Sequence, residues 1–122
     1  HEAARWIRDN TAPGTSLAVS DIGILGHESG RRIIDMFGLT DPHIARQEGR
    51  LHFKNDPRHV LEQQPHTVIL VQGQDGQYLR VPDAALAANP DFQNQYQLVH
   101  TLEVGFRDEV IQIFARPSRS AP

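Results

Sequence analysis

The chain has 122 residues, of which 39% are hydrophobic, and no cysteine. One domain with a thin hydrophobic core is therefore expected, without disulfides, thiolate nucleophiles or cysteine-based zinc sites. A net charge of -3 argues against nucleic acid as a partner, because nucleic acids select basic surfaces. The chain does not begin with methionine and opens directly in a helical pattern, so we interpret residues 1–122 as a single domain excised from a longer protein.

Short helices and short apolar strands alternate along the chain, and most are bounded by proline, glycine or a capping residue. In chain order they are a helix over residues 2–10, a strand over 17–20, a helix over 22–29, a strand over 32–35, helices over 42–46 and 58–63, a strand over 67–71, a helix over 82–88, a helical turn over 90–95, and strands over 98–104 and 109–115. Residues 116–122 read as a frayed tail.

The character of the strands predicts how they pair. The run TVILV at residues 67–71 is continuously apolar and β-branched, which indicates burial on both faces. Residues 98–104 and 109–115 alternate and are joined by Gly105-Phe106-Arg107-Asp108, which favours a hairpin. We therefore expect an α/β fold: a mixed sheet of about five strands, the first three parallel with right-handed crossovers and the last two an antiparallel hairpin, packed with short helices.

Two aspartates, Asp21 and Asp35, each end an apolar run and precede a glycine-containing turn. The carboxyl ends of parallel strands are where ligands bind in open α/β sheets. With the nearby His27, these carboxylates could bind a divalent cation or share a proton. The alternative is that they cap backbone N–H groups. Asp41, which precedes a proline, is a further ligand candidate with a stronger capping pattern.

Three other residues are candidates for ligand binding. Arg31, just before the second strand, could hold a phosphate or carboxylate, or simply be solvated. Tyr78 and Phe106 lie in predicted loops and could stack on sugar rings, or pack against the core. The sequence contains no Walker, GxGxxG, GxSxG or HExxH motif, so we assign no catalytic residue, no metal ligand and no cofactor.

Several short segments carry a family resemblance; they are residues 4–7 (ARWI), 21–23 (DIG), 34–41 (IDMFGLTD), 44–45 (IA), 64–65 (QP) and 68–70 (VIL). Over about residues 3–71 the chain resembles the C-terminal extracytoplasmic soluble domain of bacterial polytopic membrane glycosyltransferases. These are the GT-C type enzymes related to protein mannosyltransferases and aminoarabinose transferases, which use lipid-linked sugar donors. From residue 72 onward only the general strand pattern agrees.

The resemblance implies a location at the extracytoplasmic (periplasmic) face of the bacterial inner membrane. The catalytic aspartates of that family lie in loops of the membrane part, and no position here matches them. The domain would then be a non-catalytic accessory of a glycosyltransferase. Its partners would be the membrane-embedded part of the same chain and a glycan or lipid-linked sugar, with no nucleic acid.

Two other functions stay open at this point. One is a small metal-dependent enzyme that uses Asp21, Asp35 and His27. The other is a stand-alone carbohydrate-binding module, which needs exposed aromatic side chains such as Tyr78 and Phe106.

Overall fold

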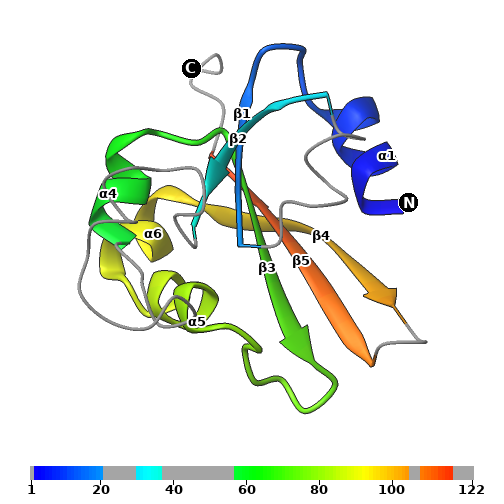
Figure 1. Ribbon diagram of the computed structural model, residues 1–122, viewed down its shortest axis with the longest axis vertical. Coiled ribbons are helices and arrows are strands. Elements are labelled where there is room, and N and C mark those ends of the chain that lie inside the picture. The colour runs from blue at the N-terminus through cyan, green and yellow to red at the C-terminus, as the bar shows by residue number, and fades with distance from the viewer. Residues whose placement is uncertain (1, 21–29, 37–56, 105–107, 117–122) are drawn as a thin grey trace.

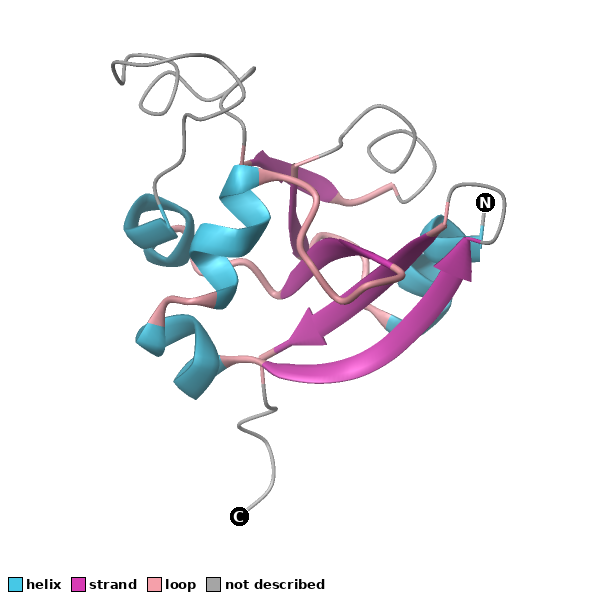
Figure 2. Cartoon of the chain, turned by 90° about the horizontal axis from the view of Figure 1, so that it is seen from below, coloured by secondary structure: helices cyan, strands magenta, loops and turns pink. Residues whose placement is uncertain are grey.

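A five-stranded mixed sheet with the strand order β2-β1-β3-β5-β4 forms the centre of the molecule (Figure 1). The computed structural model describes residues 2–20, 30–36, 57–104 and 108–116. Helix α1 (Glu2–Asn10) lies on one side of the sheet, and α4 (Pro57–Glu62), α5 (Val81–Ala87) and α6 (Pro90–Gln95) lie on the other (Figures 1 and 2). The expected α/β class is confirmed.

The first three strands are parallel, as the sequence predicts. They are β1 (Ser16–Val19), β2 (Arg32–Asp35) and β3 (Thr67–Gly73). β1 pairs with β2 over four residues but with β3 over only two, Leu17 with Thr67 and Ala18 with Val68. β3 therefore extends well beyond β1, and this surplus length shapes the site described below.

The last two strands, β4 (Gln97–Val104) and β5 (Glu109–Ala115), form the predicted antiparallel hairpin. β5 pairs with β3 along the whole length of both strands, from Thr67 opposite Ala115 to Gly73 opposite Glu109. β4 is left at the edge of the sheet, with a register shift between Leu98 and His100. Such irregularities are common in edge strands, where they hinder pairing with another chain.

One hydrophobic core lies between α1 and the sheet. Ala3, Ala4 and Ile7 of the helix pack in one cluster with alternate residues of the inner strands, Leu17, Val19, Ile69, Val71 and Ile113. Trp6 stacks on His100 of the edge strand, with ring centroids 5.0 Å apart and planes 11° from parallel. The helical spacing of the apolar residues at the start of the chain thus becomes the buried stripe of α1.

A second core lies on the opposite face, under α4, α5 and α6. It contains Val68 and Leu70 of β3 together with Val60, Leu61, Leu86 and Phe92 of the helices. All five residues of the TVILV run are buried, which confirms that β3 is covered on both faces. Val68 and Leu70 face one core while Ile69 and Val71 face the other, as the two-residue period of a strand requires.

The predicted helices over residues 22–29 and 42–46, and with them the crossovers between the parallel strands, fall largely outside the described residues. Elsewhere the predicted boundaries agree within two residues. The largest difference lies in β3, which runs on to Gly73 because β5 pairs with it that far; α4 begins one residue early, at Pro57. Gln64 ends the α4 segment with a φ of 52°.

Replacing Ile7 with alanine tests how far the fold depends on α1. Ile7 is fully buried in the core beneath the helix. The truncation leaves a cavity that the neighbouring strands cannot close, so the free energy of unfolding should fall by about 2–5 kcal/mol. Arg5→Ala, an exposed change on the same helix, is the control and should alter it by less than about 0.5 kcal/mol. Urea denaturation measures both, and equal effects would contradict the packing described here.

The stability of the fold should decrease in alkaline solution through Tyr96. Its ring is buried between Phe92 and the sheet, its hydroxyl donates to the carbonyl of Pro65, and burial raises its pKa to about 12, partly offset by the charge of Arg116. An unfolded tyrosine ionises near pH 10, so the stabilisation is complete below about pH 10 and is lost as the pH rises toward about 12.

The measurement is urea denaturation of the wild-type chain and of Tyr96→Phe at about pH 8 and about pH 11. The wild-type free energy of unfolding should fall more steeply between the two conditions than that of the variant, which cannot ionise at this position. Parallel behaviour of the two proteins would show that Tyr96 is not protected from ionisation by the fold.

Candidate functional site

The carboxyl ends of β1 and β2 lie side by side, as the positions of the two aspartates in the sequence predict. Val19 and Asp35 are partners in the parallel register, and the N–H of Met36 donates to the carbonyl of Val19 at 3.0 Å. Asp21 and His27 lie outside the described residues, and so does the side chain of Asp35. The structure therefore places the strand ends together without describing whether the three side chains converge.

Ser20, the residue after β1, is a feature of this edge that sequence reasoning missed. Its side chain is only 3% exposed, and within the described part of the chain its hydroxyl has no hydrogen-bond partner. The only signal in the sequence was its position between an apolar strand and Asp21.

Arg31 holds the end of α1. Its guanidinium donates to the carbonyl of Thr11 at 2.8 Å, to the Thr11 hydroxyl at 2.9 Å and to the carbonyl of Arg8 at 3.3 Å. These are the carbonyls that a helix leaves unsatisfied at its C-terminus. The side chain thus connects the start of β2 to α1. Two further ligand-binding candidates from the sequence, Asp41 and Phe106, lie outside the described residues.

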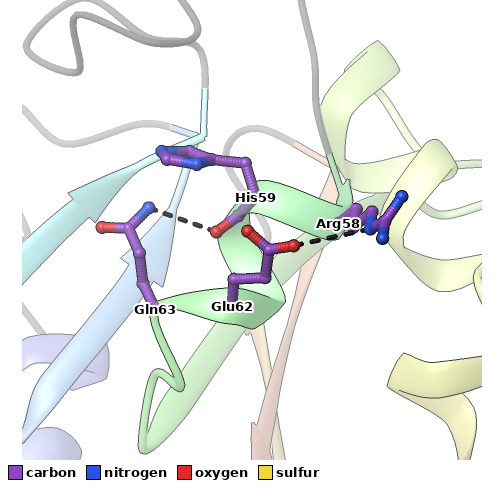
Figure 3. A network of polar contacts seen from close by, with 4 residues as sticks. All are labelled: Arg58, His59, Glu62 and Gln63. Carbon is purple, nitrogen blue, oxygen red and sulfur yellow. Dashed lines mark hydrogen bonds and ion pairs between the residues drawn. The ribbon is translucent and has the colours of Figure 1, made fainter.

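The polar residues of α4 pair along the helix itself (Figure 3). Arg58 and Glu62 form an exposed ion pair of 3.4 Å, and the amide of Gln63 donates to the carbonyl of His59 at 3.5 Å. An exposed pair of this spacing contributes only about 0.3–0.5 kcal/mol. In the close-up the two pairs lie on different sides of the helix rather than converging on one point (Figure 3).

The surplus length of β3 is covered by residues 77–79, here called the return arm. After a turn at residues 73–76, the N–H of Gly73 donates to the carbonyl of Gln77 at 2.9 Å and that of Leu79 to Val71 at 3.2 Å. Gln72 and Tyr78 form an antiparallel bridge, so their side chains share one face of the sheet. Gly76, with a φ of 83°, allows the chain to reverse.

Tyr78, a ligand candidate from the sequence, lies half-buried across β3 on the face of α4–α6. Its hydroxyl donates to Oε1 of Gln112 at 2.9 Å, and its ring packs against the second core. Burial raises the pKa of Tyr78; a hydrogen bond with Gln72 lowers it, and the nearby charge of Asp83 raises it. Gln112 of the neighbouring strand β5 therefore holds the tyrosine hydroxyl.

Asp83 of α5 is a carboxylate with no solvent exposure. Its Oδ2 accepts from the N–H of Val71 at 2.8 Å, on the edge of β3 that β1 does not reach. The return arm pairs with the carbonyl of Val71 but not with its N–H. Because a buried backbone N–H needs an acceptor, the aspartate supplies it. In the sequence Asp83 appears only as an acidic residue in the first turn of a helix, so this role could not be predicted.

Within the described ranges no three His, Asp or Glu residues are arranged to hold a metal ion. None of the helices in those ranges is long and apolar enough to cross a membrane.

The fold and these sites define a small α/β domain with a mixed sheet, a polar carboxyl edge and an aromatic side chain fixed on an open sheet face. The chain belongs to the family described as a domain of unknown function, DUF8728, which matches residues 1–118. No curated protein and no solved structure matches the chain.

Removing the Asp83 carboxylate should destabilise the sheet around the return arm. Asp83→Ala leaves the buried N–H of Val71 without its acceptor, which should cost about 1–3 kcal/mol of the free energy of unfolding. Asp83→Asn keeps an acceptor oxygen and should cost less, while Asp9→Ala on the exposed side of α1 serves as the control. Hydrogen exchange should show faster exchange at Val71 and Leu79 in the alanine variant; unchanged protection there would refute this role.

Proposed function

We propose that this chain is a non-catalytic accessory domain of a membrane glycosyltransferase, located at the extracytoplasmic face of the bacterial inner membrane. Its partners are the membrane-embedded part of the same chain and a glycan or lipid-linked sugar. In this proposal the parent protein carries out the transfer reaction, and this domain contributes binding or positioning.

The observation that carries the proposal is the resemblance over residues 3–71. Of the matching segments, residues 4–7 lie in α1, residues 34–36 at the end of β2, residues 64–65 between α4 and β3, and residues 68–70 in β3; the others lie outside the described residues. The DUF8728 family adds no function of its own to this argument.

A second candidate function is a metal-dependent enzyme built on Asp21, Asp35 and His27. Two observations favour it. Asp35, the last residue of β2, lies beside Val19, the last residue of β1. Ser20, which follows β1 directly, is buried. Both place polar groups at the carboxyl edge of parallel strands, where ligands bind in sheets of this type.

The deciding experiment is to read the natural coding sequence upstream of His1 and count its hydrophobic spans. The proposal expects several apolar stretches of about 20 residues each, the length needed to cross a bilayer. Upstream sequence without such spans would reject the glycosyltransferase assignment. The carboxylate hypothesis would then lead, and its test would be binding of Mn²⁺ by the wild-type chain and by Asp35→Asn.

A further inference from the structure

The face of the sheet that carries α4, α5 and α6 is covered by those helices over only part of its area. The far ends of β3, β5 and β4 extend beyond the helices (Figure 1). We infer that this exposed part, with Tyr78 at its centre, is a binding surface for a neutral saccharide chain. The inference deepens the proposed function by naming the surface that would hold the glycan.

The register places three rows of side chains across this face. The first row is Val68, Phe114 and Leu98, and Phe92 of α6 covers its middle, with ring centroids 5.1 Å from Phe114. The second row is Leu70, Gln112 and Thr101, and the third is Gln72, Val110 and Glu103. The face therefore changes from apolar under the helices to polar where the strands extend beyond them.

Exposure follows the same order. Leu70 is buried, Gln112, Gln72 and Val110 are half-buried, and Thr101 and Glu103 are exposed. The polar rows are thus accessible on the described structure, and they offer amide, hydroxyl and carboxylate groups in fixed register. Amides both donate and accept hydrogen bonds, as the hydroxyl groups of a sugar require.

Tyr78 provides a fixed aromatic surface beside these rows. It enters from the return arm opposite Gln72, crosses β3 and reaches Gln112 on β5, so both ends of the side chain are held. Tyrosine suits ligand contact because a large ring is immobilised at small entropic cost. The combination of one anchored ring with amide and hydroxyl groups alongside it matches the alternating apolar and polar faces of a pyranose.

The acidic residues at this end of the sheet disfavour an anionic ligand. The charge of Asp83 acts on the Tyr78 hydroxyl and raises its pKa, and Glu103 lies in the third row. Asp75 and Asp108 are exposed at the turns that bound the same end of the sheet. An anionic sugar or a phosphate would be repelled by this field, whereas the uncharged hydroxyl groups of a neutral saccharide would not.

The test is a titration of the ¹⁵N-labelled 122-residue chain with mannohexaose, maltohexaose and chitohexaose, and with hexagalacturonate as the anionic probe. At least one neutral hexaose should shift the amide resonances of Gln72, Tyr78, Thr101 and Gln112. Hexagalacturonate should shift none of them. The expected affinity is in the millimolar range.

Two variants and one control locate the surface. Tyr78→Ala removes the ring and should weaken binding about tenfold. Thr101→Ala removes an exposed hydroxyl without touching the core and should weaken binding by a smaller factor. Gln95→Ala, an exposed glutamine at the end of α6 next to the start of β4, the end opposite Glu103, should leave binding unchanged. If Tyr78→Ala does not fold, the comparison of Thr101→Ala with Gln95→Ala still decides.

Absence of binding by all three neutral hexaoses, shifts confined to other parts of the chain, or preference for hexagalacturonate would each overturn the inference. These outcomes are independent of the proposed function. Membrane spans upstream with no saccharide binding here would leave the accessory domain in place and remove only this surface. Saccharide binding without upstream membrane spans would leave this binding surface in place and remove the assignment to a membrane glycosyltransferase.

Discussion

The structure depends on the burial of the first five residues of β3, residues 67–71. The alternate side chains of this strand enter two separate cores, and its two edges pair with β1 and β5. Over these five residues the strand has almost no contact with water, so each of their N–H and C=O groups needs a partner within the protein. The neighbouring elements meet this requirement: α1 covers one face, α4–α6 the other, and β5 pairs along the entire strand.

The edge that β1 covers only in part creates the most distinctive features of the molecule. β1 pairs with only two residues of β3, and the return arm and the Asp83 carboxylate satisfy groups further along. A buried carboxylate is a costly acceptor, because it must be desolvated. Its presence here follows from geometry: α5 begins directly after the return arm, and an aspartate in its first turn reaches the Val71 N–H that a backbone carbonyl does not.

The sequence predicted those parts of the fold that a local pattern determines. The continuous TVILV run identified the central strand, and the alternation of residues 98–104 and 109–115 identified the hairpin. Which hairpin strand joins β3 follows from the side chains, although it was not predicted: β5 carries Ile111, Ile113 and Phe114, whereas β4 exposes Leu98 and Val99. The return arm, the acceptor role of Asp83 and the burial of Ser20 could not be predicted, because each depends on where another strand ends.

The same limit explains the candidate sites. The sequence could select Asp35 as the end of a strand and Tyr78 as an aromatic residue in a loop, but only the register shows what lies next to each. Arg31 illustrates the opposite case, since its charge suggested an anion site and the structure shows it on the carbonyls at the end of α1. A residue type indicates which chemistry is available, and the partner that the fold supplies determines which chemistry is used.

The distribution of anchoring contacts separates the two ends of the sheet. At the amino ends of β1, β2 and β3, hydrogen bonds link Arg32 to Thr15, His66 to Ser16 and Arg116 to His66, and Tyr96 holds Pro65. The parallel strands all run away from this end, and so their carboxyl ends, the return arm and the paired residues Val104 and Glu109 of the hairpin lie toward the other. Ser20, Asp35 and Tyr78 lie toward that second end. Exposed side chains at that second end, such as those of Asp75 and Glu103, can be replaced without touching the contacts at the amino ends of the strands, which is the condition under which a binding surface can diversify on a constant fold.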